Sequence, residues 1–259
     1  MKRWALVTGA SAGLGVEFAT QLAAQGYSLV LVARRLVELT KVQEQLVQAF
    51  DCDVEVLVAD LSKSNAPDAL YQELQNKGIE ISYLVNNAGA GGMSLADGQP
   101  WQRHAQYLEL MMLSVTHMCH LFLPAMLKQG FGRIVNVSSV AGRIARAGDT
   151  HYGPSKTYLV ALSEGLNATY KKLGVHSCAL CPGFTHTQFH KEGELRDMKA
   201  ALPKFIWYNP DVVVQEGLRA VERGKSVYVS GRMYRWLDGL FQFKLTRPLF
   251  VMQRTQGNL

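Results

Sequence analysis

Short apolar runs alternate with helical patterns along almost the whole chain. WALVT, SLVLVA and VEVLVA have the length of strands, and amphipathic stretches such as LGVEFATQLAAQG separate them. Further runs of the same kind follow as SYLVNN, GRIVNVS, HSCALC and SVYVS. Apolar strands that alternate with helices predict a parallel sheet covered on both faces. We therefore expect a single, doubly wound α/β domain with about seven parallel strands.

The composition fits one globular unit. The chain has 259 residues, 48% of them hydrophobic, which is enough to bury a substantial core. The formal charge is +6, and Lys and Arg are scattered without dense basic runs, so we expect anionic small ligands and no nucleic acid. The first apolar stretch is too short for a signal peptide, and the four cysteines form no disulfide framework. We expect a cytoplasmic protein with reduced thiols.

Three patterns have a structural interpretation that we favour over a functional one. Cys178 and Cys181 form a C-x-x-C string, but it lies in an expected strand, where residues three apart point to opposite faces. His117 and His120 have a spacing that could hold a metal, yet no further ligand is near in sequence, so we predict packing and no metal site. The apolar window 110–127 contains two histidines and a proline, and we expect it to be a buried helix rather than a membrane span.

A glycine-rich turn follows the first strand. In parallel sheets of this kind ligands bind beyond the carboxyl ends of the strands. TGASAGLG places Gly9, Gly13 and Gly15 between a strand and a helix. Glycines let the backbone approach a pyrophosphate closely, and the amides at a helix start face its negative charge. The turn predicts a nucleotide site, although a purely structural turn would show the same pattern.

A tyrosine precedes a lysine by four positions in HYGPSK. On a helix Tyr152 and Lys156 share one face. A tyrosine with a pKa of about 10 is a poor base at neutral pH, and a cation within about 4–6 Å lowers that pKa by roughly 1–3 units. We therefore expect the ammonium to lower the pKa of the phenol and to prepare it for proton transfer. The alternative is a pair of ordinary surface residues.

Five ordered motifs together resemble the short-chain dehydrogenase/reductase family. They are TGASAGLG, NNAG at 86–89, Ser139 in NVSS, YGPSK, and PGFTHT at 182–187. The resemblance covers residues 3 to about 231 and is nearest to the branch of 3-oxoacyl reductases and hydroxysteroid dehydrogenases. It implies a Rossmann-like fold and a nicotinamide-dependent oxidoreductase that moves a hydride between the cofactor and a carbonyl or alcohol carbon. The alternative is a cofactor-binding regulatory or scaffold protein with little or no turnover.

The resemblance assigns a role to each catalytic residue. It implies that Tyr152 is the general acid, that Lys156 lowers its pKa and holds the cofactor ribose, and that Ser139 orients the substrate oxygen. Ser138 is the neighbour that a shift of one residue would select, but in a strand its side chain points the other way. The family also usually has an asparagine on the long central helix, where it holds a water in a proton relay. This chain has Met111 there, so the backbone carbonyl, Ser114 or another group would have to place that water, or the relay is broken and turnover is slow.

The resemblance also implies a set of cofactor contacts. The expected residues are Gly9, Ser11, Gly13, Leu14, Gly15, Asp60, Leu61, Asn87, Tyr152, Lys156 and Thr185. Each could instead be a turn or cap residue, and Asp60 most of all. The second strand ends in LVARR with no acid, so we expect Arg34, helped by Arg35, to bind a 2′-phosphate and to favour NADPH over NADH.

The chain is expected to divide into a catalytic part and an extension. Residues 1–232 form the NADP-binding Rossmann-type domain, and its loop 184–209 is rich in aromatic residues, which favours a hydrophobic carbonyl substrate. Residues 233–259 mix aromatic and basic side chains. This mixture suits a contact within a homodimer or homotetramer, and peripheral membrane contact is the less favoured alternative.

Overall fold

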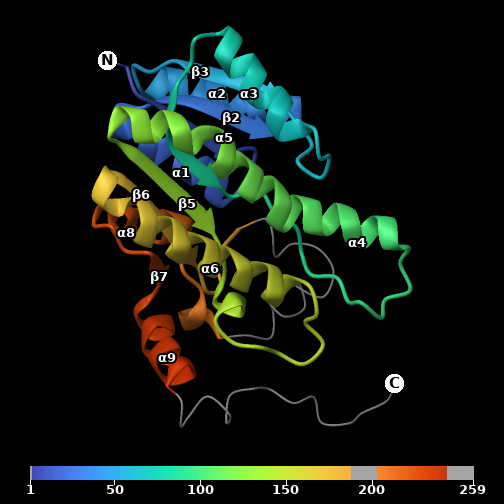
Figure 1. Ribbon diagram of the computed structural model, residues 1–259. Coiled ribbons are helices and arrows are strands. Elements are labelled where there is room, and N and C mark those ends of the chain that lie inside the picture. Colours follow the sequence, from blue (N-terminus) through green and yellow to red (C-terminus); the bar gives the residue numbers. More distant parts are fainter. Residues whose placement is uncertain (1, 188–202, 244–259) are drawn as a thin grey trace.

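A single parallel sheet of seven strands forms the centre of the computed structural model, which describes residues 2–187 and 203–243 (Figure 1). The sheet order is β3-β2-β1-β4-β5-β6-β7, and every neighbouring pair is parallel. The strands are β1 Trp4–Thr8, β2 Ser28–Ala33, β3 Val54–Val58, β4 Ile81–Asn86, β5 Gly132–Val137, β6 Val175–Cys181 and β7 Val227–Val229. The prediction of one doubly wound, Rossmann-like domain is confirmed.

Helices cover both faces of this sheet. One face carries α1 Leu14–Ala24, α2 Leu36–Ala49 and α8 Pro210–Glu222, whose apolar side chains share one core cluster with the strands. The other face carries α3 Ala66–Asn76, α5 Ser114–Gln129 and α6 Tyr152–Tyr170. Further helical segments are α4 Trp101–Leu108, α9 Arg232–Gln242 and the short turns η2 Val140–Gly142, η3 Lys171–Leu173 and η5 Lys204–Ile206.

The strands are apolar throughout because both of their faces are buried. In β2 Leu29 and Leu31 enter the core under α1 and α2, whereas Val30 and Val32 enter the core under α3 and α5. The same alternation separates the two cysteines of β6. Cys178 joins the first of these cores, and Cys181 lies with residues of α6 and α9 in a third cluster, so the expected opposite orientation is confirmed.

The long central helix is not uniform. The sequence predicts one helix from Trp101 to Lys128, but a π-helical turn, η1 Glu109–Leu113, separates α4 from α5. Together they form the one helix of the described residues that is long and apolar enough to cross a membrane. However, α5 buries Met118, Phe122 and Met126 in the core against the sheet, as expected for a core helix.

The topology brings the candidate residues to one edge. β1 lies between β2 and β4, so the chain reverses its winding direction beside β1. Parallel α/β sheets bind ligands at such a switch point, beyond the carboxyl ends of the strands. The glycine turn after β1, Asn87 after β4 and the serines after β5 all lie at that edge.

Candidate functional site

Helix α6 presents the tyrosine and the lysine from its first two turns. It begins at Tyr152, and the Asp149 carboxylate accepts a hydrogen bond from the Gly153 amide at 2.9 Å. A carboxylate at this position satisfies an amide that the helix leaves unpaired and complements the positive end of the helix dipole. Pro154 is tolerated because it lies in the first turn. The start of α6, and with it Tyr152, is therefore fixed.

Lys156 is buried behind the tyrosine. The residue is 5% exposed, and its Nζ donates a hydrogen bond to the Val137 carbonyl at 2.8 Å. The same Nζ lies 5.6 Å from the centre of the Tyr152 ring. Burial lowers the pKa of Lys156 to about 8. The ammonium form therefore still predominates at neutral pH, which is only about one pH unit below this pKa.

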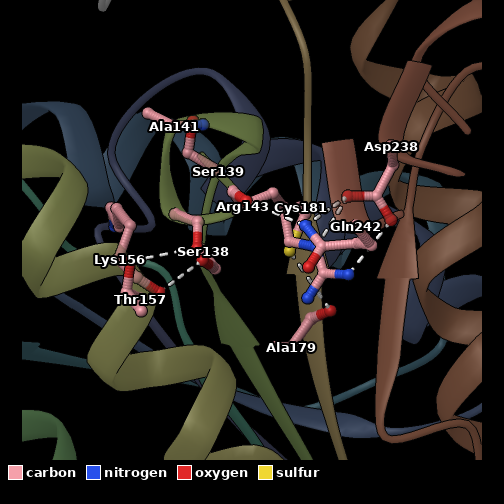
Figure 2. A network of polar contacts seen from close by, with 11 residues as sticks. Ser138, Ser139, Ala141, Arg143, Lys156, Thr157, Ala179, Cys181, Asp238 and Gln242 are labelled. Atoms are coloured by element: carbon pink, nitrogen blue, oxygen red, sulfur yellow. Dashed lines mark hydrogen bonds and ion pairs between the residues drawn. The ribbon is translucent and has the colours of Figure 1, made fainter. Parts of the chain in front are cut away.

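The two serines after β5 have different partners. The Ser139 hydroxyl accepts a hydrogen bond from the Ala141 amide at 3.1 Å and is also hydrogen-bonded to the Tyr152 phenol. The Ser138 hydroxyl points to α6 and donates to the Lys156 carbonyl at 2.7 Å (Figure 2). The structure thus brings together Ser139, Tyr152 and Lys156, while Ser138 holds the strand to the helix.

The pKa of the Tyr152 phenol is shifted in the direction opposite to the expectation. Burial raises the pKa of Tyr152, the hydrogen bond with Ser139 only partly opposes this, and the Asp149 carboxylate adds to the rise. The prediction that the pKa of Tyr152 is lowered overall is therefore wrong. The ammonium lies beside the ring but does not outweigh the loss of hydration. The phenol is consequently protonated at neutral pH, which is the form that donates a proton.

The glycine turn after β1 is shaped for close approach. Gly9 has a φ of 66°, and a Cβ on Gly15 would overlap the Gly9 carbonyl. The Asn87 side-chain amide donates to the carbonyls of Thr8 at 2.9 Å and of Gly9 at 3.3 Å, so it clamps the turn. Asn87 therefore supports the turn through its own hydrogen bonds, a role that its sequence position alone does not indicate.

The same turn leads into the open end of a helix. Helix α1 begins at Leu14, with Gly13 before it and no side chain capping its first amides. Unpaired amides at a helix start are a good site for a pyrophosphate. Thr187, from the PGFTHT segment, packs against Gly13 and was not singled out from the sequence. The donors and the space that glycine leaves fit the phosphates of a nicotinamide cofactor.

Two arginines lie at the end of β2. Arg35 donates to the Ser11 hydroxyl at 3.3 Å, and Arg34 is exposed. Partial burial would raise the pKa of Asp60, but hydrogen bonds from Ser62 and the Arg34 charge lower it overall. Asp60 thus holds the turn after β3. The Leu61 side chain is 6% exposed and lies in the core, and its expected place beside the cofactor stays a prediction.

The ends of the expected substrate loop are joined to each other. Thr185 pairs with Tyr208 in an isolated parallel bridge, and its hydroxyl donates to the Gly183 carbonyl at 3.0 Å. The ring of Trp207 lies 5.1 Å from Phe184 and is largely buried, whereas Phe205 is 74% exposed. Thr185 is itself buried. Phe189 and His190 lie outside the described residues.

A buried histidine pair adjoins the catalytic helix. Nε2 of His151, the residue before Tyr152, lies 3.1 Å from Nδ1 of His104 in α4. Nε2 of His104 in turn lies 3.4 Å from an Asp97 carboxylate oxygen. Sequence reasoning missed this pair because its members are far apart along the chain. The HY dipeptide of the YGPSK region is the only signal, and alone it is uninformative.

Met111 occupies the π-helical turn η1. It is 1% exposed, and its Sδ accepts a hydrogen bond from the Ala90 amide at 3.3 Å. A Cβ on Gly89 would be 3.4 Å from this sulfur and 3.7 Å from Nζ of Lys156, so both atoms border the same small space. The Ser114 hydroxyl donates to the Leu110 carbonyl within its own helix. π-Helical turns are frequent at functional sites, and this one faces the active-site lysine.

The remaining histidine pair contacts a carboxylate. His117 lies 3.2 Å from an Asp68 oxygen, and the rings of His117 and His120 are 6.4 Å apart. Among residues 2–187 and 203–243 no three His, Cys, Asp or Glu side chains are grouped as metal ligands would be. His117 thus links α5 to α3 at the surface.

The chain is similar to oxidoreductases of known structure and sequence. It is 30% identical to a very-long-chain 3-oxoacyl-CoA reductase of Anas platyrhynchos, over 73% of this chain and 61% of that enzyme. It thus spans less than two thirds of that relative. A short-chain dehydrogenase of Sphingobium yanoikuyae, solved in complex with NADPH, is 28% identical, with a TM-score of 0.78 over 99% of this chain and 98% of that one. A bulky-bulky ketone specific alcohol dehydrogenase of Comamonas testosteroni is 25% identical, with a TM-score of 0.77 over 98% and 97%.

A family model supports the same relationship over most of the chain. The model described as short chain dehydrogenase matches residues 3–197. This range contains the glycine turn, Ser139, Tyr152 and Lys156, which the fold gathers at one edge of the sheet. The chain belongs to the short-chain dehydrogenase family, and is therefore an oxidoreductase that acts on alcohol or carbonyl groups with a nicotinamide cofactor.

Proposed function

We propose that this protein is an NADPH-dependent reductase of a ketone or 3-oxoacyl carbonyl on a hydrophobic substrate. The observation that carries the proposal is the contact between the Ser139 hydroxyl and the Tyr152 phenol, with the Lys156 ammonium directly behind the ring. These groups lie at the edge of the sheet where the glycine turn opens. A proton donor and a hydrogen-bonding group at one point suit a carbonyl oxygen.

The proposed chemistry divides between the cofactor and the chain. The bound cofactor supplies a hydride to the carbonyl carbon. The Ser139 hydroxyl holds the carbonyl oxygen, and the Tyr152 phenol gives its proton to that oxygen as negative charge develops on it. Its raised pKa keeps the proton in place until then. The Lys156 ammonium stabilises the phenolate that remains, as long as the pH stays below its pKa of about 8.

The preference for NADPH rests on the end of β2. Arg34 and Arg35 are exposed there, and the strand ends without an acid that would hold ribose hydroxyls. A 2′-phosphate carries nearly two negative charges and pairs well with guanidinium groups. The Sphingobium relative was solved with NADPH, which is consistent with this choice.

A hydrophobic substrate is favoured by the loop that follows β6. The rings of Phe184 and Trp207 lie 5.1 Å apart at its base in a tilted arrangement, and Phe205 in the same loop is exposed. Aromatic side chains at the rim of a site offer large apolar surfaces to a ligand. The relatives that act on very-long-chain 3-oxoacyl-CoA and on bulky ketones are consistent with the same class.

A further part of the proposal concerns assembly and location. Trp236 on α9 is 67% exposed, and Phe243 directly after α9 is 56% exposed. We infer that a second copy of the chain covers them in a cytoplasmic homo-oligomer. Binding to a membrane surface is the alternative. Light scattering and vesicle binding of the wild type and of a Trp236→Ser, Phe243→Ser variant separate the two. The proposal fails if neither mass nor lipid binding differs between the proteins.

The activity is tested by a screen of carbonyl compounds. Medium-chain and long-chain 3-oxoacyl thioesters, aromatic ketones and steroid ketones are each mixed with NADPH and the protein, and NADPH absorbance is followed. We expect turnover with at least one compound, and a loss of roughly 100-fold or more in Tyr152→Phe with NADPH binding nearly intact. Undiminished turnover by Tyr152→Phe on a substrate verified with the wild type would refute the role of the phenol.

A further inference from the structure

Helix α9 contacts both the segment after Ser139 and the base of the substrate loop, although it lies beyond the region that the family model matches. We propose that α9 is a positioning element of the active site. In this proposal Asp238 fixes the loop that carries Ser139, and Tyr234 joins the two ends of the substrate loop. The inference rests on the proposed function for its kinetic consequences. Its structural consequences can be measured without a substrate.

The first contact is an ion pair with the serine loop. The Arg143 guanidinium donates from Nε to one Asp238 oxygen at 2.8 Å and from Nη2 to the other at 3.1 Å. The two side chains are only 17% and 19% exposed, so water screens the pair little. Gln242, one turn further along α9, donates to the Arg143 carbonyl at 2.8 Å. Figure 2 shows Arg143 extending from the Ser138–Ser139 side towards Asp238 and Gln242.

Arg143 is connected to Ser139 by a short rigid segment. The turn η2 joins them, and the Gly142 amide donates to the Ser139 carbonyl at 3.0 Å. A Cβ on Gly142 would overlap the backbone of Lys156, so this turn is pressed against α6. The Val140 amide also donates to the Pro182 carbonyl at 3.0 Å. We therefore expect a shift of Arg143 to be transmitted through this segment to the Ser139 hydroxyl.

The second contact closes the base of the substrate loop. The Tyr234 hydroxyl accepts a hydrogen bond from the Phe184 amide at 3.2 Å and donates one to the Ile206 carbonyl at 2.9 Å. These two groups lie near opposite ends of the loop 184–209. The Tyr234 ring also lies directly against Gly183 and leaves no room for a side chain there. One buried hydroxyl thus ties the start of the loop to its end.

Helix α9 is itself anchored independently of these contacts. Arg235 pairs with the Glu216 carboxylate of α8 at 3.1 Å, and that carboxylate also accepts from the Gly231 amide at 2.9 Å. The anchor fixes α9 to the body of the domain through a third point. Because of it, removal of the Asp238 charge is expected to release the serine loop without detaching the helix.

The test compares Asp238→Asn and Tyr234→Phe with a matched control. The control, Glu222→Gln, removes one partner of the Arg133–Glu222 ion pair. Its contact distance of 2.8 Å equals that of the Arg143–Asp238 pair, but Arg133 lies at the start of β5, away from the site. Each protein is assayed with NADPH and a medium-chain 3-oxoacyl thioester, and NADPH affinity is measured by fluorescence. Amide hydrogen exchange is followed for the segments 138–147, 183–187 and 203–208 without substrate.

Two different patterns are expected. Asp238→Asn should lower kcat about tenfold or more while KM and the Kd for NADPH change less than about threefold, because the serine acts on the reacting oxygen. Tyr234→Phe should instead raise KM for the thioester about fivefold or more. Hydrogen exchange should become faster in 138–147 for the first variant, and in 183–187 and 203–208 for the second. The control should change none of these quantities.

The proposal is overturned if both variants match the Glu222→Gln control in hydrogen exchange, whatever the activity. If the wild type reduces no carbonyl compound, the proposed function fails but the exchange data still decide the positioning role. If Asp238→Asn does not fold, Arg143→Lys takes its place in the test. This variant keeps the positive charge but loses the two parallel hydrogen bonds to the Asp238 carboxylate. Faster exchange of 138–147 in that variant supports the proposal, and exchange at the wild-type rate contradicts it.

Discussion

Replacement of Lys156 by methionine should change how the stability of the fold depends on pH. The lysine is buried, and this lowers its pKa to about 8 from 10.5 in the unfolded chain. The unfolded chain therefore binds more protons than the native protein between these two values. The free energy of unfolding consequently rises with pH across this window, and the penalty of burying the charge is present in full below about pH 8.

The size of the effect follows from the two pKa values. At about 1.4 kcal/mol for each unit, the buried ammonium costs roughly 3 kcal/mol at neutral pH. Methionine of similar length removes this cost but leaves the Val137 carbonyl without its donor, which costs about 1–3 kcal/mol. The two proteins should thus have similar stability near pH 7, or the variant should be slightly more stable. Between about pH 7 and 9.5 the wild type should gain about 2 kcal/mol relative to the variant.

Urea unfolding of the cofactor-free proteins measures this difference. Unfolding free energies of the wild type and of Lys156→Met are determined at intervals across that pH range, and one is subtracted from the other. The subtraction cancels the other titrating groups and the pH-independent loss of the Val137 contact. A difference that stays constant with pH, or that moves in favour of the variant as pH rises, would refute the burial argument.

Three further changes have expected outcomes. Replacing both Arg34 and Arg35 with glutamine should lower kcat/KM with NADPH about 100-fold or more and with NADH less than about threefold, since each charged hydrogen bond contributes roughly 1.5–3 kcal/mol. Equal losses with both cofactors would contradict the phosphate contact. Gly15→Ala should abolish binding of NADPH in a fluorescence titration because the added Cβ displaces the Gly9 carbonyl, and unchanged affinity would contradict it. Met111→Asn should change turnover less than about tenfold, and a gain of about 100-fold would show a defective proton relay and favour the regulatory function.

The sheet, and the grouping of Ser139, Tyr152 and Lys156 beside it, can be predicted from the sequence because both depend on local patterns. Runs such as SLVLVA are apolar at every position, which only a strand buried on both faces requires. Because side chains alternate in direction along a strand, Ser138 and Ser139 point opposite ways, and only the Ser139 hydroxyl meets Tyr152. The spacing of Tyr152 and Lys156 likewise becomes a shared helix face.

Other features depend on contacts that no local pattern contains. Arg143 and Asp238 are 95 residues apart, and nothing in either neighbourhood indicates the pairing. The direction of the Tyr152 pKa depends on how much water the fold removes, which outweighs the nearby charge. The π-helical turn at Met111 interrupts a stretch whose sequence is helical throughout. The burial of the Leu61 side chain likewise depends on core residues that are distant in sequence.

Transfer of labelled hydride tests the central proposal most directly. The wild type and Tyr152→Phe are incubated with a 3-oxoacyl thioester or ketone and NADPH that carries deuterium at the transferred position, and the alcohol is analysed by mass spectrometry and NMR. The mechanism predicts that the wild type places the deuterium on the new carbinol carbon and that Tyr152→Phe forms at most about a hundredth of this product. Consumption of NADPH without deuterium in the product, or transfer by Tyr152→Phe at the wild-type rate, would contradict it.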